Sequence, residues 1–394
     1  MLVNALLLAL GLATGILTAR LLGPYGRGAL ALGTAIAGLT TVIVGLGLQQ
    51  AFAYLVAAKR ETAQMAAGLA IVSGLLAGGF AVALGWLVVP LFVSDATVVL
   101  VIRVGLLAVP GSLIATNITG LLQGLRFGRR FNMTRLFQPS AYCAGTVGVA
   151  LIADAATPQA IVGVYAVAAS TNALVGSFLL SPSIRRLRMP SRRFTAAALR
   201  YGAVAGIGGA ALAANTHLAI PILGALTGLR ETGFYAVALS YAIPVTLVAS
   251  AIAIHTLPDV AAADHGGRMR LVRRRLGTTF ASLLPMAGAA LLLAPVLVPT
   301  IFGENFRLAV PAAQMLVVAQ GFRAVAYVLA DSARGIGRPG LPSGAEAVGV
   351  IAAAGLLPIV VPEYGVEGAA VVAAGANAAV AVVIGVGVKR ALRA

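Results

Sequence analysis

Near its middle the chain reads Pro182-Ser-Ile-Arg-Arg-Leu-Arg-Met-Pro-Ser-Arg-Arg-Phe-Thr-Ala-Ala-Ala-Leu-Arg200, with six arginines and two prolines. The rest of the chain is very different, because 60% of all 394 residues are hydrophobic and only 10% are charged. Ordinary soluble domains carry about 25% charged residues. The basic stretch therefore indicates a polar linker between two halves of a membrane protein.

Six apolar segments lie on each side of this linker, and most are near the length of about 20 residues that a membrane-spanning helix needs. They cover residues 2–22, 29–58, 66–93, 98–122, 133–153, 158–181, 201–226, 233–257, 276–301, 308–332, 341–361 and 367–388. We predict an all-α membrane protein with about 12 transmembrane helices in two parallel six-helix lobes around a central cavity. The predicted lobes are residues 1–181 and 201–394, joined by a cytoplasmic linker at 182–200.

The net charge of +17 is explained by topology. Of the 28 Lys and Arg residues, 22 fall in alternate connections, in the linker or at the C-terminal tail. Cytoplasmic loops of membrane proteins retain Lys and Arg, so both termini are expected in the cytoplasm. A nucleic-acid partner, which a basic pI could otherwise suggest, is not expected.

Two weak internal matches indicate a repeat. Gly26-Arg-Gly-Ala-Leu-Ala-Leu32 aligns with Gly233-Phe-Tyr-Ala-Val-Ala-Leu239 at an offset of 207 residues. Gln123-Gly-Leu-Arg126 aligns with Arg334-Gly-Ile-Gly337 at an offset of 211. Six spans are an even number, so the repeats are parallel, as in transporters that work by alternating access.

Glycines four residues apart let membrane helices approach closely. Such pairs occur at Gly11 and Gly15, at Gly74 and Gly78, and at Gly202 and Gly206. We interpret them as packing positions.

No enzyme signature is present. The three histidines are not spaced as a zinc site, and no predicted span contains a pair of carboxylates for acid–base catalysis. No phosphate-binding loop of the Gly-x-x-x-x-Gly-Lys type occurs, and the one cysteine, Cys143, cannot form a disulfide within the chain. We expect no enzymatic activity, no metal site and no cofactor.

Polar residues within the spans are candidates for substrate binding, because charge inside a bilayer is costly. Gln320, Arg323, Tyr327 and Asp331 recur at helical spacing and predict a polar stripe on one helix. Arg323 either contacts substrate in a cavity or pairs with a carboxylate of a neighbouring span. Both interpretations remain open from the sequence.

The remaining candidates lie in the first half. Arg103 is about two turns inside its span and either binds substrate or extends to the outer interface. Thr18 belongs to a weakly polar face of the first span, which ends at Arg20. That face either lines a passage or packs against another helix.

Three stretches resemble a known family. Ala19-Arg-Leu-Leu-Gly-Pro-Tyr-Gly-Arg-Gly-Ala29 is similar to the turn between the first two helices of Wzx-like polysaccharide-biosynthesis flippases, in the multidrug/oligosaccharidyl-lipid/polysaccharide exporter superfamily. Phe302-Gly-Glu-Asn-Phe-Arg-Leu-Ala-Val-Pro311 is similar to their outer turn before helix 10, and Tyr364-Gly-Val-Glu-Gly-Ala-Ala370 to the start of helix 12.

This resemblance implies a flippase that moves an undecaprenyl-pyrophosphate-linked oligosaccharide across a bacterial inner membrane for surface polysaccharide synthesis, such as O-antigen or lipopolysaccharide. Arg20 occupies a position of the family's motif, and cavity arginines of related flippases hold the pyrophosphate. Implied partners are the lipid-linked oligosaccharide, membrane lipids, and a polymerase and glycosyltransferases of the same pathway.

Two other functions remain open. A multidrug exporter of organic cations, driven by H⁺ or Na⁺ antiport, would need carboxylates at membrane depth, for which Asp331 and Glu346 are the candidates. A scaffold or a lipid-modifying enzyme is disfavoured by the repeat and by the missing catalytic cluster.

Overall fold

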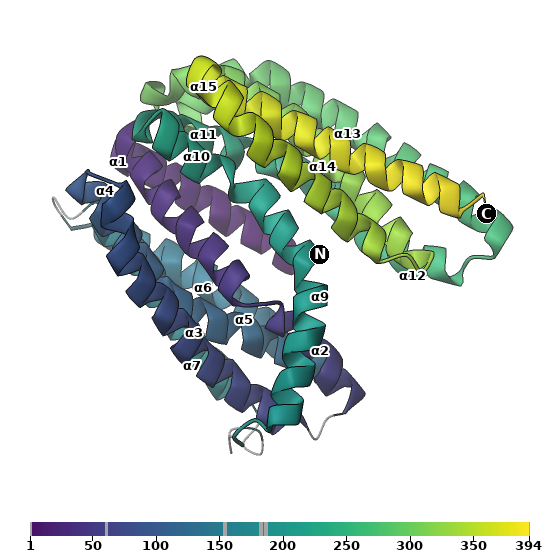
Figure 1. The fold of residues 1–394 in the computed structure, drawn as a ribbon. Coiled ribbons are helices and arrows are strands. Elements are labelled where there is room, and N and C mark those ends of the chain that lie inside the picture. The colour runs from purple at the N-terminus through teal and green to yellow at the C-terminus, as the bar shows by residue number, and fades with distance from the viewer. Residues whose placement is uncertain (1, 60–61, 153–155, 181–183, 185–187, 394) are drawn as a thin grey trace. The chain divides into compact units, whose positions relative to one another are not determined.

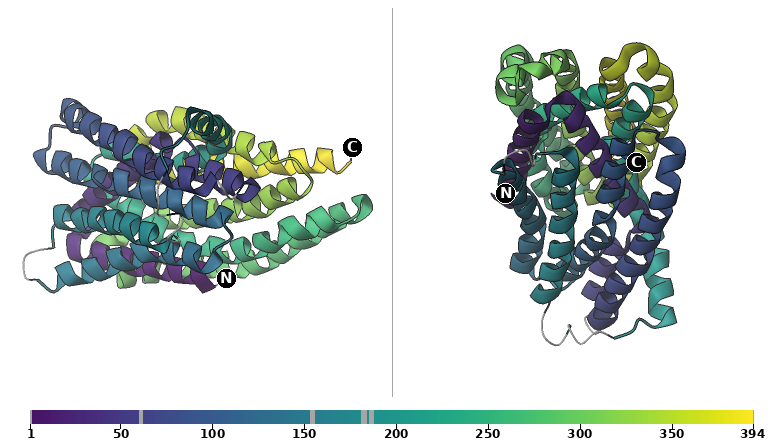
Figure 2. Two further views of the ribbon diagram at one scale, coloured as in Figure 1. Left: turned by 90° about the horizontal axis from the view of Figure 1, so that it is seen from below. Right: turned by 90° about the vertical axis from the view of Figure 1, so that its left-hand side faces the viewer.

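The structure is a computed structural model that describes residues 2–59, 62–152, 156–180, 184 and 188–393. Throughout these ranges the chain forms helices and their connections, without strands (Figure 1; Figure 2). This all-helical fold was predicted from the sequence.

The chain forms two compact units. The first unit contains residues 2–22 and 29–213, and the second contains residues 23–28 and 214–394. The sequence placed the division at 182–200. Residues 182–183 and 185–187 of that segment lie outside the described residues, and a helix begins within it at Arg192.

Among the described residues, the first unit contains six whole helices and most of two others. They are α1 (Leu2–Val44, apart from residues 23–28), α2 (Leu48–Ala58), α3 (Ala63–Phe92), α4 (Ala96–Leu106), α5 (Ala108–Gly124), α6 (Gly128–Ala150), α7 (Pro158–Leu179) and α9 (Arg192–His217). Helix α5 packs against α2, α3 and α7, and so forms the centre of this unit.

The second unit contains the end of α9 and the helices that follow. These are α10 (Ala219–Leu226), α11 (Leu229–Ala242), α12 (Thr246–Ala262), α13 (His265–Phe302), α14 (Val310–Gly335) and α15 (Gly340–Ala391), with short 3-10 turns at Ile243–Val245 and Glu304–Ala309. Helix α14 packs against α12, α13 and both halves of α15, and Figure 1 shows α14 and α15 side by side.

Two long helices are each interrupted by a glycine. Gly23 in α1 has φ 63° and Gly365 in α15 has φ 52°, which L-residues with side chains rarely adopt. At the second interruption the backbone N–H of Val366 donates to Glu231 Oε2 at 3.1 Å, so a carboxylate caps the start of the last helix. Four predicted spans each contain two consecutive helices: the second part of α1 with α2, α4 with α5, α9 with α10, and α11 with α12. If each of these is counted as one rod and each interrupted long helix as two, the described ranges contain the twelve predicted helical rods.

The ends of α5 and α14 are built alike. Arg126 (φ 59°) and Gly337 (φ 79°) both have a left-handed backbone conformation. The N–H of the following residue reaches back five positions in each case, from Phe127 to Leu122 O (3.0 Å) and from Arg338 to Ala333 O (2.9 Å). This is the Schellman arrangement of a helix end. The predicted repeat at an offset of 211 residues is therefore confirmed here.

The other repeat has a different register from the predicted one. Gly28 packs on the carbonyl of Leu229, and Gly233 packs on the carbonyl of Pro24, where added Cβ atoms would come within 1.8 and 1.9 Å of the two oxygens. Residues 24 and 28 thus correspond to 229 and 233, an offset of 205 rather than 207. The prediction failed by two residues because short apolar motifs also match when shifted.

Small residues bring the helices together, as expected where lipid provides no hydrophobic drive for helix association. Added Cβ atoms at Gly74 and Gly78 would come within 2.2–2.7 Å of α5 atoms, and those at Gly202 and Gly206 within 2.5–2.7 Å of the turn at Gly47. Both predicted packing pairs are confirmed. At Gly11 a Cβ would meet nothing within 4 Å, so the packing prediction there is wrong.

The surface is suited to a bilayer. Eight segments of the described chain are long and apolar enough to cross a membrane by length and composition. Large apolar side chains on α3, including Leu76, Phe80 and Leu87, are exposed. The protein is therefore a multi-pass membrane protein.

Candidate functional site

A cavity of about 190 Å³ lies within the second unit. Helices α14 and α15, the end of α9 and the segment from α11 to α12 surround it. Its polar lining residues are Asn215, Thr216, Tyr235, Thr246, Gln320, Arg323, Tyr327 and Asn377. A pocket with several hydrogen-bonding groups among apolar side chains is the usual form of a small-molecule site.

Arg323 is the central charged group of this site. It is the fourteenth residue of the 26-residue helix α14, so it lies at mid-helix. Its Nη1 donates to Glu346 Oε1 at 2.5 Å and its Nη2 to Asn377 Oδ1 at 2.6 Å. The side chains of Arg323 and Glu346 are only 5% and 12% exposed. The cation is therefore neutralised inside the protein.

Two amides complete the network. Asn215 Nδ2 donates to the second carboxylate oxygen of Glu346 at 3.1 Å, and Asn377 Nδ2 donates to Ala319 O at 3.1 Å. Gly349 gives Asn215 its room, because a Cβ there would lie 2.7 Å from Nδ2. Among the described residues, the amides bonded to the buried ion pair thus come from the end of α9 and from the second half of α15.

Three of the six predicted site residues come together here. Gln320, Arg323 and Tyr327 line the cavity as the stripe predicted. Asp331, the fourth member of the stripe, instead accepts from Arg334 at 2.5 Å and belongs to the end of α14.

The candidates on α1 belong to the first unit. Thr18 is buried, and its hydroxyl donates to Thr14 O in the same helix at 2.8 Å. Arg20 is exposed. Neither residue lines the cavity around Arg323.

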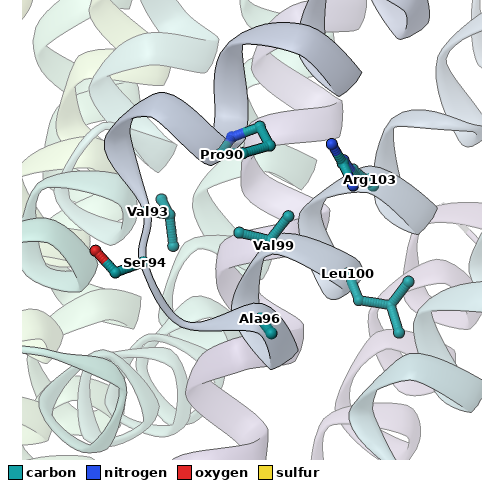
Figure 3. A pocket seen from close by; sticks show the side chains of 7 residues that line it. All are labelled: Pro90, Val93, Ser94, Ala96, Val99, Leu100 and Arg103. Atoms are coloured by element: carbon teal, nitrogen blue, oxygen red, sulfur yellow. The ribbon is translucent and has the colours of Figure 1, made fainter.

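Arg103 joins α3 to α4. Its Nη2 donates to Trp86 O at 2.6 Å, the Trp86 indole donates to Arg103 O at 3.3 Å, and the guanidinium carbon lies 5.3 Å from the indole centroid. Arg103 also lines an open groove of about 530 Å³, where Val99 lies near the middle of the group and Ser94 and Arg103 at opposite sides (Figure 3). This contact holds two helices together and leaves an apolar groove beside it.

Glu346 was predicted only as a carboxylate of the alternative cation exporter, and Asn215 and Asn377 were not among the predicted site residues. Each is visible in the sequence as a polar residue in an apolar segment. Nothing local connects them to Arg323, because the bonded residues are 23 and 54 positions away from it. Within the described ranges no three His, Cys, Asp or Glu side chains meet as a metal site would require.

Comparison with known families now adds to this geometry. A family described as "Polysaccharide biosynthesis protein" matches residues 17–311. The chain belongs to this family. The match covers all of the first unit from residue 17 and much of the second, and it ends at the start of α14. Comparison with curated proteins by sequence gives no match.

This member of the polysaccharide-biosynthesis family has the fold of the MOP-superfamily transporters. A structure of the lipid II flippase MurJ in an inward closed conformation has a TM-score of 0.82 and 15% identity, over 98% of this chain and 87% of that one. An inward-facing multidrug resistance MATE family transporter gives 0.78 and 17%, over 98% and 94%. A MOP superfamily transporter from Pyrococcus furiosus gives 0.61 and 17%, over 99% and 92%. At such identities the likeness establishes the fold.

Proposed function

We propose that this protein is a flippase that moves an undecaprenyl-pyrophosphate-linked oligosaccharide across the bacterial inner membrane by alternating access, for surface polysaccharide synthesis such as O-antigen or lipopolysaccharide. The family match over residues 17–311 carries the proposal. Further support comes from the fold shared with a lipid II flippase, since that protein moves a lipid-linked substrate. Glycosyltransferases and a polymerase would act before and after this step.

The cavity chemistry suits a sugar better than a free ion. Gln320 and Tyr327 offer an amide and a hydroxyl beside Arg323, and Asn215 and Asn377 add two more amides. Such groups donate and accept hydrogen bonds, as sugar hydroxyls require. We assign these residues to substrate contact, and we keep Arg20, Thr18 and Arg103 as candidates in the first unit.

A cation exporter is the less favoured alternative. The carboxylate of Glu346 lies within a helix and accepts a hydrogen bond from Asn215, which lines the cavity. It is bound to Arg323, however, and an organic cation would have to displace this internal partner. Since a buried charge left without its partner is costly, the pair disfavours cation exchange at this position.

Export can be tested directly. Cells that lack this protein should accumulate the lipid-linked oligosaccharide on the inner leaflet, and the wild-type gene should restore its export. Unchanged oligosaccharide with increased sensitivity to cationic drugs would instead establish the exporter.

The cavity residues provide a more specific test. Gln320→Ala and Tyr327→Phe should each lower export about fivefold or more at unchanged protein amount, because each removes a cavity group outside the Arg323–Glu346 network. Val318→Ala is the matched control, since Val318 is an exposed side chain on the same helix. Normal export by both cavity variants would refute the cavity assignment.

The proposed topology places both termini and the basic linker in the cytoplasm. Single cysteines at Arg188 and Asn305, in a Cys143→Ala background, should react oppositely with an impermeant thiol reagent on intact cells. Position 305 should label from outside and position 188 only after lysis. The opposite pattern would invert the topology.

A further inference from the structure

The first unit contains a polar pair that resembles the one around Glu346. Arg135 is the eighth residue of α6 and its side chain is half-buried. Its Nη2 donates to Asn4 Oδ1 of α1 at 3.0 Å. The guanidinium carbon lies 5.4 Å from the Phe131 ring centroid. Arg135 lies inside the predicted span 133–153, and in the structure its helix contacts another helix through this hydrogen bond.

The two pairs occupy corresponding places in the repeat. Asn4 and Arg135 are 131 residues apart, and so are Asn215 and Glu346. The pairs are separated by 211 residues, the same offset as the matching ends of α5 and α14. In the first unit an asparagine of α1 is bonded to a positive residue of α6. In the second unit an asparagine at the end of α9 is bonded to a negative residue in the first half of α15.

The two units also differ at the position of Arg323, which neutralises Glu346 in the second unit. The residue 211 positions before Arg323 is Ser112, which is small and buried. Ser112 forms a side-chain hydrogen bond with Tyr165, and so does Gln138, which lies one helical turn after Arg135 in α6. The first unit thus has neutral polar groups where the second has the arginine.

Carboxylates are scarce in the first half of the chain. Residues 1–213 contain 15 Lys and Arg but only three acidic residues, whereas residues 214–394 contain 13 and eight. Asp95 caps α4, and Glu61 and Asp154 lie outside the described residues. Among the described residues Arg135 contacts a neutral amide and an aromatic ring, while both terminal nitrogens of Arg323 are bound to protein acceptors.

From this asymmetry we propose that Arg135, oriented by Asn4, binds phosphate oxygens of the substrate's diphosphate. A guanidinium has five N–H donors, and the bond to Asn4 uses one, which leaves a fork for two oxygens. Phe131 covers one face and restricts hydration of the cation. The ligand identity rests on the proposed function, whereas the anion site rests on the geometry.

The test measures binding of a fluorescent short-chain polyprenyl diphosphate to the purified full-length protein in lipid nanodiscs. Arg135→Gln should weaken binding at least tenfold. Asn4→Asp should also weaken it at least tenfold, because a carboxylate beside Arg135 would neutralise it as Glu346 neutralises Arg323. The same melting temperature or a higher one for Asn4→Asp would separate this effect from unfolding.

Arg129→Gln is the matched control, since Arg129 is an exposed arginine of the same helix. It removes the same charge and should change affinity less than twofold. Wild-type affinity in both Arg135→Gln and Asn4→Asp, or an equal loss in Arg129→Gln, would overturn the proposal.

Competition experiments identify the source of the phosphate. Inorganic pyrophosphate that competes as well as the polyprenyl diphosphate would point to a site for free anions, whereas weak competition would show that the lipid is required. The proposed function can fail separately: normal binding at Arg135 without any oligosaccharide export by the wild-type protein would refute the flippase only. Normal export with unaltered binding in Arg135→Gln would refute this site only.

Discussion

Glu346→Ala is expected to lower the free energy of unfolding by about 3–5 kcal/mol, because it leaves a buried arginine without its ionic partner. The Arg323 side chain is 5% exposed, and Asn377 is the one acceptor that it would keep among the described residues. The protein should therefore be less abundant in the membrane, and the detergent-purified protein should melt at a lower temperature.

Two comparisons make this result specific. Glu367→Ala removes an exposed carboxylate from the same helix and should leave the melting temperature nearly unchanged. The double variant Arg323→Met with Glu346→Leu removes both charges and should recover most of the lost stability, since buried ion pairs can be replaced by apolar residues. Equal stability of Glu346→Ala and Glu367→Ala would contradict a structural role for the pair.

Gly233→Val should prevent accumulation of folded protein, with an expected cost of at least about 3 kcal/mol. The Cβ atom alone would lie 1.9 Å from Pro24 O, and the neighbouring atoms are backbone that cannot rotate away. Gly28→Val should have the same effect through Leu229 O, at 1.8 Å. Membrane abundance and size-exclusion profiles measure both variants.

Gly355→Ala is the matched control for the glycine contact. A Cβ at Gly355 would meet nothing within 4 Å, and the position is exposed within α15. Alanine is about 0.5–1 kcal/mol more favourable than glycine in a helix, so this variant should be stable or slightly stabilised. If Gly233→Val accumulated as well as Gly355→Ala, the close packing at residues 24–28 and 229–233 would not be needed for folding.

The sequence by itself determined the class of the protein and its twelve helical rods. A run of about 20 hydrophobic residues can be recognised from the local sequence alone. Inside a bilayer such a run must form a helix, because its backbone N–H and C=O groups find no water to bond. The glycines at 23, 303 and 365 lie within motifs that resemble the family's turns, and all three have positive φ. The Gln320–Arg323–Tyr327 stripe was also predictable, because helical spacing places these side chains on one face.

Only the tertiary structure decided what the charged residues contact. Arg323 and Glu346 are 23 residues apart, and Asn4 and Arg135 are 131 apart, so no local pattern joins them. A buried polar group must find its partner wherever packing brings one within hydrogen-bonding distance, and that depends on which helices the fold makes neighbours.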